Sequence, residues 1–500
     1  MNTAQPLPRL ALIDRSQLLL HSVDVENLIE PEHSARSIWE LIGRLDLSHY
    51  YSEIAAVEGH AGRDHTAPQL LISLWLYAYS RGISSAREIA RRCAFEPGFA
   101  WLCGLQPISH RTLAGFRSAH KEALDDLFVQ VVGMLSAEGL ITMERVTLDG
   151  TKIKANASGN TFRRKEKLEA HLALAREQVQ KMNEQAADEE KVSARRAAAQ
   201  RRAARQRTSR LEAALREVER LQQGKRHDEF TARASTTDPE AHVMRNGEGG
   251  TVPSYNVQLV TDTTHGLVVN VEATTDAIDY RQVDGALKRC EEKLGILPAQ
   301  LVADGDYTNH TSVQATANAG VDFYGSWHDS WKPSERDAHG RCGNFISSAF
   351  PYDAARDVYT CPAGNLLTLL TIREQESGVR TIVYRASKTA CRRCALRDKC
   401  GPKKQRPGWA RSISRNEDSP ASAAFKAKME TEAAKQIYRQ RSQIAEFPHA
   451  WLKERCGLRQ FRCRGKLKTS MEATWACLSY NLIRWFSIRR NFKAQVAAWA

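Results

Sequence analysis

Apolar residues recur at helical spacing through the first 130 residues of the chain. The clearest series are Ile38, Leu41, Ile42 and Leu45, and the run from Leu70 to Leu76 that ends near Gly82. Residues three and four apart share one face of a helix, so these series predict helices that each have one apolar side. Shorter segments at 85–93, 98–103 and 109–120 follow, with Gly and Pro between them. We therefore expect an all-α domain over residues 1–130.

The last of these helices carries a basic face. Ser109 is a typical N-cap residue, and Arg111, Arg117, His120 and Lys121 follow it. A basic helix after a short turn suits the reading of DNA, and we take Arg111 and Arg117 as candidate DNA contacts. The alternative is a solvated face on a small helical bundle.

The pattern changes to strands after residue 140. Runs of β-branched and apolar residues predict strands at 144–157, 255–260, 267–273, 301–304 and 321–324, with helices at 281–294 and 308–318. A local hairpin followed by helical crossovers implies an α/β class fold, an α+β mixed sheet flanked by helices. We assign this domain to residues 140–330 plus 430–490.

Two long inserts interrupt that domain. Residues 162–226 contain no Pro and are rich in Ala, Glu, Arg, Lys and Gln, and Leu211, Leu215 and Val218 share a helix face. This predicts a helical hairpin or coiled coil as an insert over 158–245. Its basic stretch at 191–207 is either a solvated face or a phosphate contact. A second insert spans 330–430.

The second insert holds a cysteine cluster. Cys391 and Cys394 form a Cys-x2-Cys pair, Cys400 follows six residues later, and Cys361 lies upstream. Four thiolates at this spacing suit a structural Zn²⁺, with Cys342 as a substitute ligand. Free thiols and an iron–sulfur cluster are the alternatives.

Three acids stand where metal-dependent phosphoryl transfer needs them. Asp149 and Asp304 each follow a short apolar run and precede Gly, which is typical of a strand tip, and Glu446 comes from a later helix. Converging carboxylates bind Mg²⁺ or Mn²⁺, and a pair of such ions activates the attacking and leaving oxygens of a displacement. Each acid alone has an ordinary reading as a turn or surface residue. The competing acids are Asp279, Asp306, Glu432 and Glu454.

The net charge of the chain indicates which kind of molecule it binds. The 500 residues include 72 Lys and Arg against 58 Asp and Glu, a net charge of +14, which favours a polyanion such as nucleic acid. Residues 1–30 lack the apolar core of a signal peptide, and no apolar run reaches the length of a membrane span. We therefore expect a cytoplasmic protein with no membrane partner and with reduced cysteines.

These motifs together resemble the bacterial insertion-sequence DDE transposases, whose catalytic domain is RNase H-like. The amino-terminal phrases are similar to the InsH-type branch, namely Glu30-Pro31-Glu32-His33, Trp101-Leu102-Cys103-Gly104 and His110-Arg111-Thr112-Leu113. Asp149 and Asp304 match the family's first and second catalytic aspartates. The pattern Tyr438-x2-Arg441 and Glu446-x6-Lys453 is similar to its Tyr-Arg-Glu-Lys signature, with Glu446 as the third acid.

The resemblance implies an RNase H-like fold, in which three antiparallel strands precede alternating helices and strands. It also implies phosphate contacts by Tyr438 and Lys453 at the transposon end. The signature departs at one point, since four residues separate Arg441 from Glu446 where three are usual. This offset moves Arg441 off the Glu446 face of a helix, and Pro448 is placed to kink it. We therefore rely more on Glu446 and Lys453 than on Arg441.

The leading hypothesis is a DNA transposase. It would bind terminal inverted repeats of its own element through residues 30–130, cut the DNA ends and transfer the 3′-hydroxyl to target DNA, as a homodimer associated with the bacterial nucleoid. Two alternatives stay open. One is a nuclease of the same fold without strand transfer, and the other is a DNA-binding regulator whose acids are inert.

Overall fold

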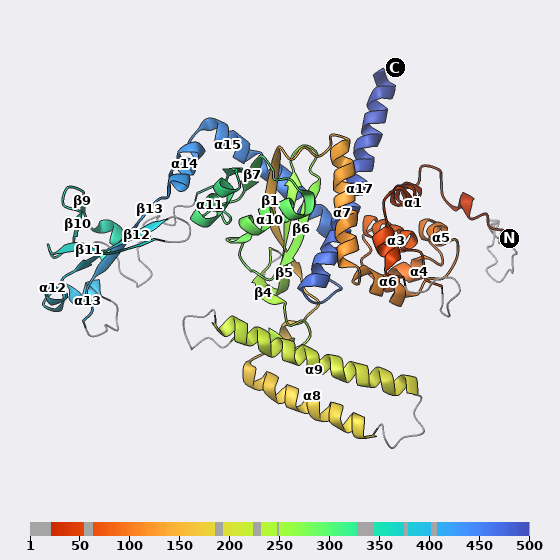
Figure 1. Ribbon diagram of the computed structural model, residues 1–500, viewed down its shortest axis with the longest axis horizontal. Helices are drawn as coiled ribbons and strands as arrows, with labels where there is room; N and C mark the ends of the chain where they lie inside the picture. Colours follow the sequence, from red (N-terminus) through yellow and green to blue (C-terminus); the bar gives the residue numbers. More distant parts are fainter. Residues whose placement is uncertain are drawn as a thin grey trace, which may run out of the picture.

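A six-stranded mixed sheet lies at the centre of the molecule, with the N-terminal helices on one side and a second sheet on the other (Figure 1). The computed structural model describes residues 22–54, 64–185, 194–223, 232–247, 250–327, 345–374, 379–401 and 408–499. None of the helices in these ranges is long and apolar enough to cross a membrane.

The N-terminal region is helical, as predicted. Its elements are η1 (Glu26–Leu28), α1 (Ser34–Arg44), α2 (Ser48–Ser52), α3 (Pro68–Ser80), α4 (Ala86–Arg92), α5 (Pro97–Leu102), α6 (His110–Arg117) and α7 (Lys121–Ala137). Helix α3 is buried almost all round because α1, α5, α6 and the final helix, α17 (Lys466–Trp499), pack against it. Ser109 caps α6 by accepting a hydrogen bond from the Arg111 backbone N–H, as the sequence predicted.

The central sheet has the strand order β6–β5–β1–β7–β8, with β4 beside the other end of β5. Its strands are β1 (Arg145–Lys154), β4 (His242–Arg245), β5 (Thr251–Asp262), β6 (Val268–Thr274), β7 (Gln300–Ala303) and β8 (Asp322–Tyr324). Strands β1, β5 and β6 are antiparallel, whereas β7 and β8 run parallel to β1. Three antiparallel strands followed by parallel ones confirm the expected mixed-sheet fold, which is consistent with an RNase H-like domain.

Helices cover both faces of this sheet. On one face, α16 (Arg441–Glu454) packs on β1 and α17 packs on β6. The amide of Asn481 on α17 bonds both the N–H and the C=O of Val268, which fixes that helix on the sheet. On the other face, α10 (Gln282–Leu294) is held to β6 by the ion pair of Arg289 with Glu272 at 2.6 Å. Helix α11 (His310–Asn318) connects β7 to β8.

Two structures project from the sheet. Helices α8 (Lys165–Gln185) and α9 (Ala194–Gln223) form an arm below the sheet in Figure 1. The arm follows the short strand β2 (Phe162–Arg163) and η2 (Gly159–Thr161), and leads to β3 (Ala234–Ser235). It has its own small core, whose members are Leu168, Leu172, Ala175, Leu211, Ala214 and Val218.

The second projection is a five-stranded antiparallel sheet that the sequence analysis did not predict. Its strands are β9 (Tyr352–Asp353), β10 (Val358–Thr360), β11 (Leu366–Glu374), β12 (Arg380–Ala386) and β13 (Ser412–Glu417). It is preceded by η4 (Ser347–Ala349), and it also carries the short helices α12 (Lys388–Arg392) and α13 (Arg397–Cys400). Helices α14 (Pro420–Met429) and α15 (Glu432–Arg439) then return the chain to the central sheet.

Candidate active site

Asp149 and Asp304 lie side by side in register on adjacent parallel strands. The last residue pair between β1 and β7 is Leu148 with Ala303, and each aspartate is the next residue along its strand. β7 ends there, as predicted, but β1 does not. It continues through Gly150 to Lys154 because β5 still pairs with it, so Asp149 lies within a strand and not at its tip.

The two carboxyl groups lie close together and partly buried, and this changes the pKa of each. Burial raises the pKa of Asp304, and the neighbouring Asp149 carboxylate raises it further. Burial also acts to raise the pKa of Asp149, but His449 outweighs it, with help from the Gly150 N–H and Arg441, and the pKa of Asp149 lies below its ordinary value. Asp149 is therefore the anion on which the surrounding positive groups converge.

Two of those groups come from α16. The Arg441 Nη1 lies 3.8 Å from the Asp149 Oδ2, and the His449 Nε2 lies 3.5 Å from the same oxygen. The sequence analysis gave Arg441 less weight than Glu446, yet the structure turns Arg441 toward the site. It did not single out His449 at all. The available signal was that residues 441, 445, 448, 449 and 452 share one face of a helix.

His449 is buried, and neither of its ring nitrogens has a hydrogen-bond partner within the described part of the chain. A buried polar atom without a partner is uncommon and calls for a ligand, an ion or water. Its position next to Asp149 therefore fits a site that is completed by something outside the chain.

Glu446 is exposed on the flank of α16. His449 lies three positions after it in the sequence, which places the two side chains about 60° apart around the helix. Across the described ranges, no group of three or more His, Cys, Asp or Glu side chains stands close enough together to hold a metal ion. The structure thus brings two of the three predicted acids together and leaves the third on an adjacent surface.

Gly150 shapes the opposite face of β1. An added Cβ would lie 2.5 Å from the Gln258 Nε2, 2.8 Å from the Asp279 Oδ1 and 2.9 Å from the Asn256 Oδ1. Asp279 accepts hydrogen bonds from the amides of both Asn256 and Gln258, at 2.7 Å each. Alternate residues of a strand face opposite sides, so Asp279, a competing acid in the sequence, lies across the sheet from the Asp149 side chain.

The candidate DNA contacts divide into exposed and buried residues. Arg111 is exposed on α6, and Lys453 is partly exposed on α16. Tyr438 on α15 packs against the apolar cluster of Val302, Tyr324 and Ala434 at the edge of the sheet.

The prediction for Arg117 is corrected by the structure. Its side chain is buried, donates to the Ser84 carbonyl at 2.7 Å and pairs with the buried Glu472 at 3.4 Å. It also lies over the ring of Trp75. A guanidinium enclosed in this way holds α6 to α17 and is not available to DNA.

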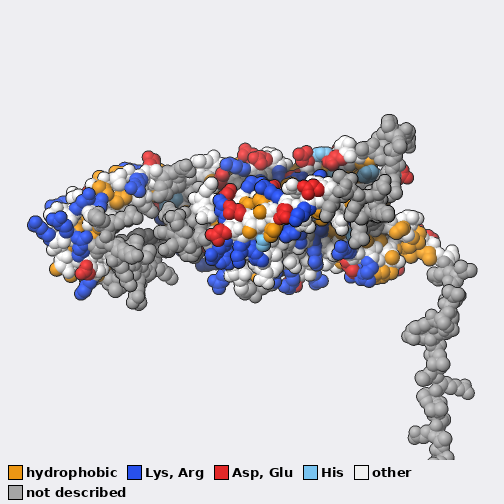
Figure 2. Space-filling model, turned by 90° about the horizontal axis from the view of Figure 1, so that it is seen from below, with side chains coloured by type: hydrophobic (Ala, Val, Ile, Leu, Met, Phe, Trp, Pro, Cys, Tyr) orange, Lys and Arg blue, Asp and Glu red, His pale blue; other side chains and the backbone are white. Residues whose placement is uncertain are grey.

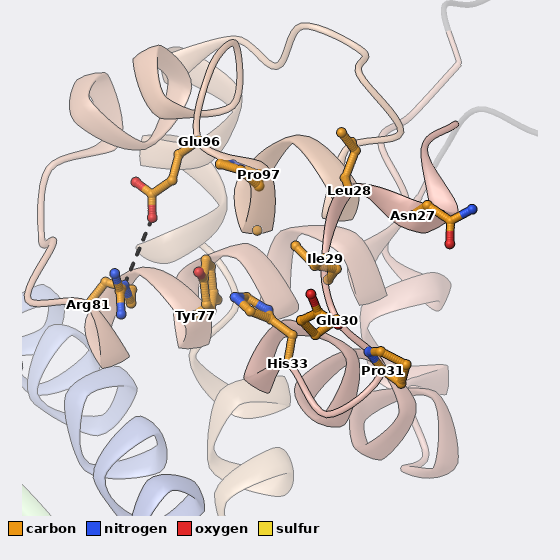
Figure 3. A pocket seen from close by; sticks show the side chains of 11 residues that line it. Asn27, Leu28, Ile29, Glu30, Pro31, His33, Tyr77, Arg81, Glu96 and Pro97 are labelled. Atoms are coloured by element: carbon orange, nitrogen blue, oxygen red, sulfur yellow. Dashed lines mark ion pairs between the residues drawn. The ribbon is translucent and has the colours of Figure 1, made fainter. Parts of the chain in front are cut away.

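A hollow of about 520 Å³ between the N-terminal helices is lined in part by residues of the motif Glu30-Pro31-Glu32-His33 (Figure 3). His33, from the motif Glu30-Pro31-Glu32-His33, caps α1 by accepting a hydrogen bond from the Ala35 N–H. Gly98 lies against it, and a Cβ there would stand 2.3 Å from the Tyr77 hydroxyl. The motif therefore serves helix packing at this point.

The four candidate zinc ligands line one small hollow of the second sheet. Cys361, Cys391, Cys394 and Cys400 surround a space of about 20 Å³, and none of the four forms a disulfide. Backbone N–H groups of Asn365 and Arg411 donate to the sulfurs of Cys361 and Cys391 at 3.3 and 3.5 Å. These thiols are not close enough together to count as a formed metal site. The substitute ligand Cys342 lies outside the described residues.

Two family models match the chain at its two ends. The Transposase domain (DUF772) matches residues 23–119, which are the N-terminal helices up to α6. The Transposase DDE domain matches residues 360–486, which include α16 with Glu446 and most of α17. A comparison with curated proteins found no match. Two transposase models match this chain, with a mixed sheet of the expected order between them, so the chain is similar to the DDE transposases of insertion sequences at both matched segments.

Proposed function

We propose that this transposase binds the terminal inverted repeats of its own element, cuts the DNA at those ends and joins the exposed 3′-hydroxyl to target DNA. The observation that carries the proposal is the shared register of Asp149 and Asp304 on adjacent parallel strands. Two carboxyl groups held this close, on a buried surface of a protein that acts on DNA, suit phosphoryl transfer.

Asp149, Asp304 and Glu446 are the proposed ligands of Mg²⁺ or Mn²⁺. The two aspartates fit a divalent cation because burial and then the neighbouring Asp149 carboxylate raise the pKa of Asp304, and a bound cation would offset this concentration of negative charge. When bound, such ions activate the attacking oxygen and stabilise the leaving oxygen of an in-line displacement. Glu446 would complete the set from the exposed flank of α16.

Arg441 and His449 have a separate role in this proposal. Both contact the same oxygen of Asp149, so they fix the orientation of that carboxylate. Nε2 of His449 faces Asp149, and neither ring nitrogen makes a hydrogen bond within the described residues, so His449 would also contact a phosphate oxygen of the scissile strand. His449 thus orients both the acid and the DNA.

Binding of the element's ends is assigned to exposed cations of the helical domain and of α16. Arg111 lies at the start of α6, near the Ser109 cap, where backbone N–H groups also favour phosphate. Lys453 lies seven residues after Glu446, on the same side of α16. A homodimer would hold two ends together, as transposition of a linear element requires both.

A cleavage and joining assay tests the function. The substrate is a labelled duplex that carries one inverted repeat and its flank, and a supercoiled plasmid serves as target. Cutting at the repeat boundary followed by joining to the plasmid is the expected result. Cutting without joining would favour the nuclease, and metal-independent binding without any strand breakage would favour the inert regulator.

A further inference from the structure

The distal half of α9 is a strongly basic helix that the proposed chemistry does not use. From Ala194 to Arg210 the sequence holds seven Arg and six Ala, and no Asp or Glu. Alanine and arginine are both strong helix formers, which explains why the segment is helical. The composition does not by itself explain why so many positive charges share one short stretch.

In the part of the arm nearest the sheet, charged residues of α8 and α9 form ion pairs with each other. Lys165 pairs with Glu219 at 3.1 Å, and Arg176 pairs with Glu212 at 2.9 Å, so α8 and α9 are joined by ion pairs as well as by their apolar core. The distal half differs. In the described part of the arm, Arg201, Arg202 and Arg205 make no ion pair with any acid.

This arrangement costs stability. Arg201 and Arg205 are four residues apart on one helix, and Arg202 and Arg205 are three apart, so each pair brings like charges together. Such pairs destabilise a helix by about 0.2–0.5 kcal/mol each. A surface that carries this cost without a compensating acid among the described residues is complementary to a polyanion.

Arg202 and Arg205 are exposed and point away from α8. Leu211 faces α8 and is buried, whereas Arg202 is nine residues earlier, about 180° around the helix. A shallow hollow runs along this outer side, lined by Ala198, Arg201, Arg202, Arg205, Gln206 and Ser209. Seen from the side on which the arm stands, many Lys and Arg side chains lie over the middle of the molecule, with Asp and Glu side chains among them (Figure 2).

We propose that this outer face of α9, which we call the arginine stripe (Ala198 to Ser209), binds the phosphates of duplex DNA. The inference rests on the proposed function, since it assigns a second DNA contact to the same enzyme. Small Ala side chains between the arginines let a DNA backbone approach the helix closely. Twelve residues of helix are about 18 Å long, enough to follow roughly five base pairs.

The arm is anchored so that such a contact is transmitted to the catalytic sheet. Glu217 on α9 bonds the His242 Nε2 at 2.7 Å, and the His242 Nδ1 lies 2.6 Å from the Thr275 carbonyl. His242 belongs to β4, beside β5. DNA held on the stripe is thereby fixed relative to the sheet that carries Asp149.

The salt dependence of DNA binding tests the proposal. The variant is Arg202→Gln with Arg205→Gln, and the matched control is Lys167→Gln with Lys181→Gln, which removes the same charge from exposed positions of α8. Dissociation constants for a duplex are measured without divalent metal over a range of KCl concentrations. The expected result is that the slope of log Kd against log salt falls by about 1.8 in the stripe variant, since each phosphate contact contributes about 0.9.

The control should keep the slope of the wild-type protein, and circular dichroism should show unchanged helix content, since Gln is a good helix former. An unchanged slope in the stripe variant, or an equal fall in both variants, overturns the proposal. Either result leaves the cleavage assay unaffected, because that assay depends on the acids. If the wild-type protein binds no DNA at all, the stripe and the proposed function fail together.

Discussion

Asp149 and its neighbour Gly150 lie on opposite faces of the central sheet, and different residues pack against each of them. Asp149 meets Arg441 and His449, whereas Gly150 lies against the amides of Asn256 and Gln258. The apolar run and the Asp-Gly pair in the sequence were sufficient to predict the acid. They could not show that position 150 needs a glycine because neighbouring side chains leave no room for a Cβ, since the pair was expected to form a turn.

Gly150→Ala should therefore impair cleavage without touching a ligand. The new Cβ overlaps the side-chain ends of Gln258, Asn256 and Asp279, which are held by hydrogen bonds, so we expect β1 to shift at a cost of about 1–3 kcal/mol. A displacement of Asp149 of this kind should lower the cleavage rate at least tenfold. Gly159→Ala is the control because nothing lies near its Cβ position. Equal activity of the two variants would contradict the packing argument.

The residues that the sequence analysis missed or misplaced have partners far away in the chain. His449 looked like one polar residue in a charged helix, and only the fold reveals that it meets Asp149. Arg117 looked like part of a basic face, because charge along a sequence gives no information on burial. Its partner Glu472 lies 355 positions later.

At the scale of elements, α6 is joined to α17 by that buried pair. Glu472 also accepts hydrogen bonds from the backbone N–H groups of Arg462 and Cys463, so it ties the segment before α17 into the same contact. Removing one partner leaves an uncompensated buried charge.

Arg117→Met should therefore reduce the free energy of unfolding by about 3–5 kcal/mol. Arg111→Met, on the exposed side of the same helix, should change it by less than about 0.5 kcal/mol. Chemical denaturation with matched m-values provides the measurement. The account of α6 would be wrong if Arg117→Met left stability intact and instead lowered the salt slope of DNA binding.

The strands of the central sheet were predicted from the sequence except for β4, which fell within the predicted helical insert, whereas the second sheet was not predicted at all. Strands β1, β5, β6 and β7 carry short groups of apolar and β-branched residues, most of them buried because both faces of the sheet are covered. Strands β9 and β10 are two and three residues long, and β11 is largely exposed, so it has no clear alternation of buried and exposed positions. The cysteine spacing drew attention to this region without indicating a sheet.

The zinc prediction for that region stays a prediction, and metal analysis tests it. If Cys361, Cys391, Cys394 and Cys400 bind structural zinc, the purified protein should contain about one zinc ion per chain. Cys394→Ser should release it and lower the melting temperature of the protein. Four thiols that react freely with a thiol reagent, in protein free of zinc, would refute the prediction.

At the scale of the whole molecule, the proposed DNA contacts are distributed over three parts of the chain around one sheet. The helical domain presents Arg111, the arm presents the arginine stripe, and α16 presents Lys453 next to the acids. The order of the parts along the chain was predictable from the family resemblance. Their arrangement in space was not, since it depends on the packing of α17 against both the helical domain and the sheet.

The central claim is that Asp149, Asp304 and Glu446 form one catalytic site. The measurement that tests it most directly is Mg²⁺-dependent cleavage of an inverted-repeat duplex by Asp149→Asn, Asp304→Asn and Glu446→Gln, with DNA binding followed in the same samples. Glu454→Gln, on the same helix as Glu446 and equally exposed, is the matched control. We predict that the three variants bind DNA but lose cleavage by at least a thousandfold, while Glu454→Gln cuts normally. Normal cutting by Glu446→Gln, or by either aspartate variant, would contradict the account.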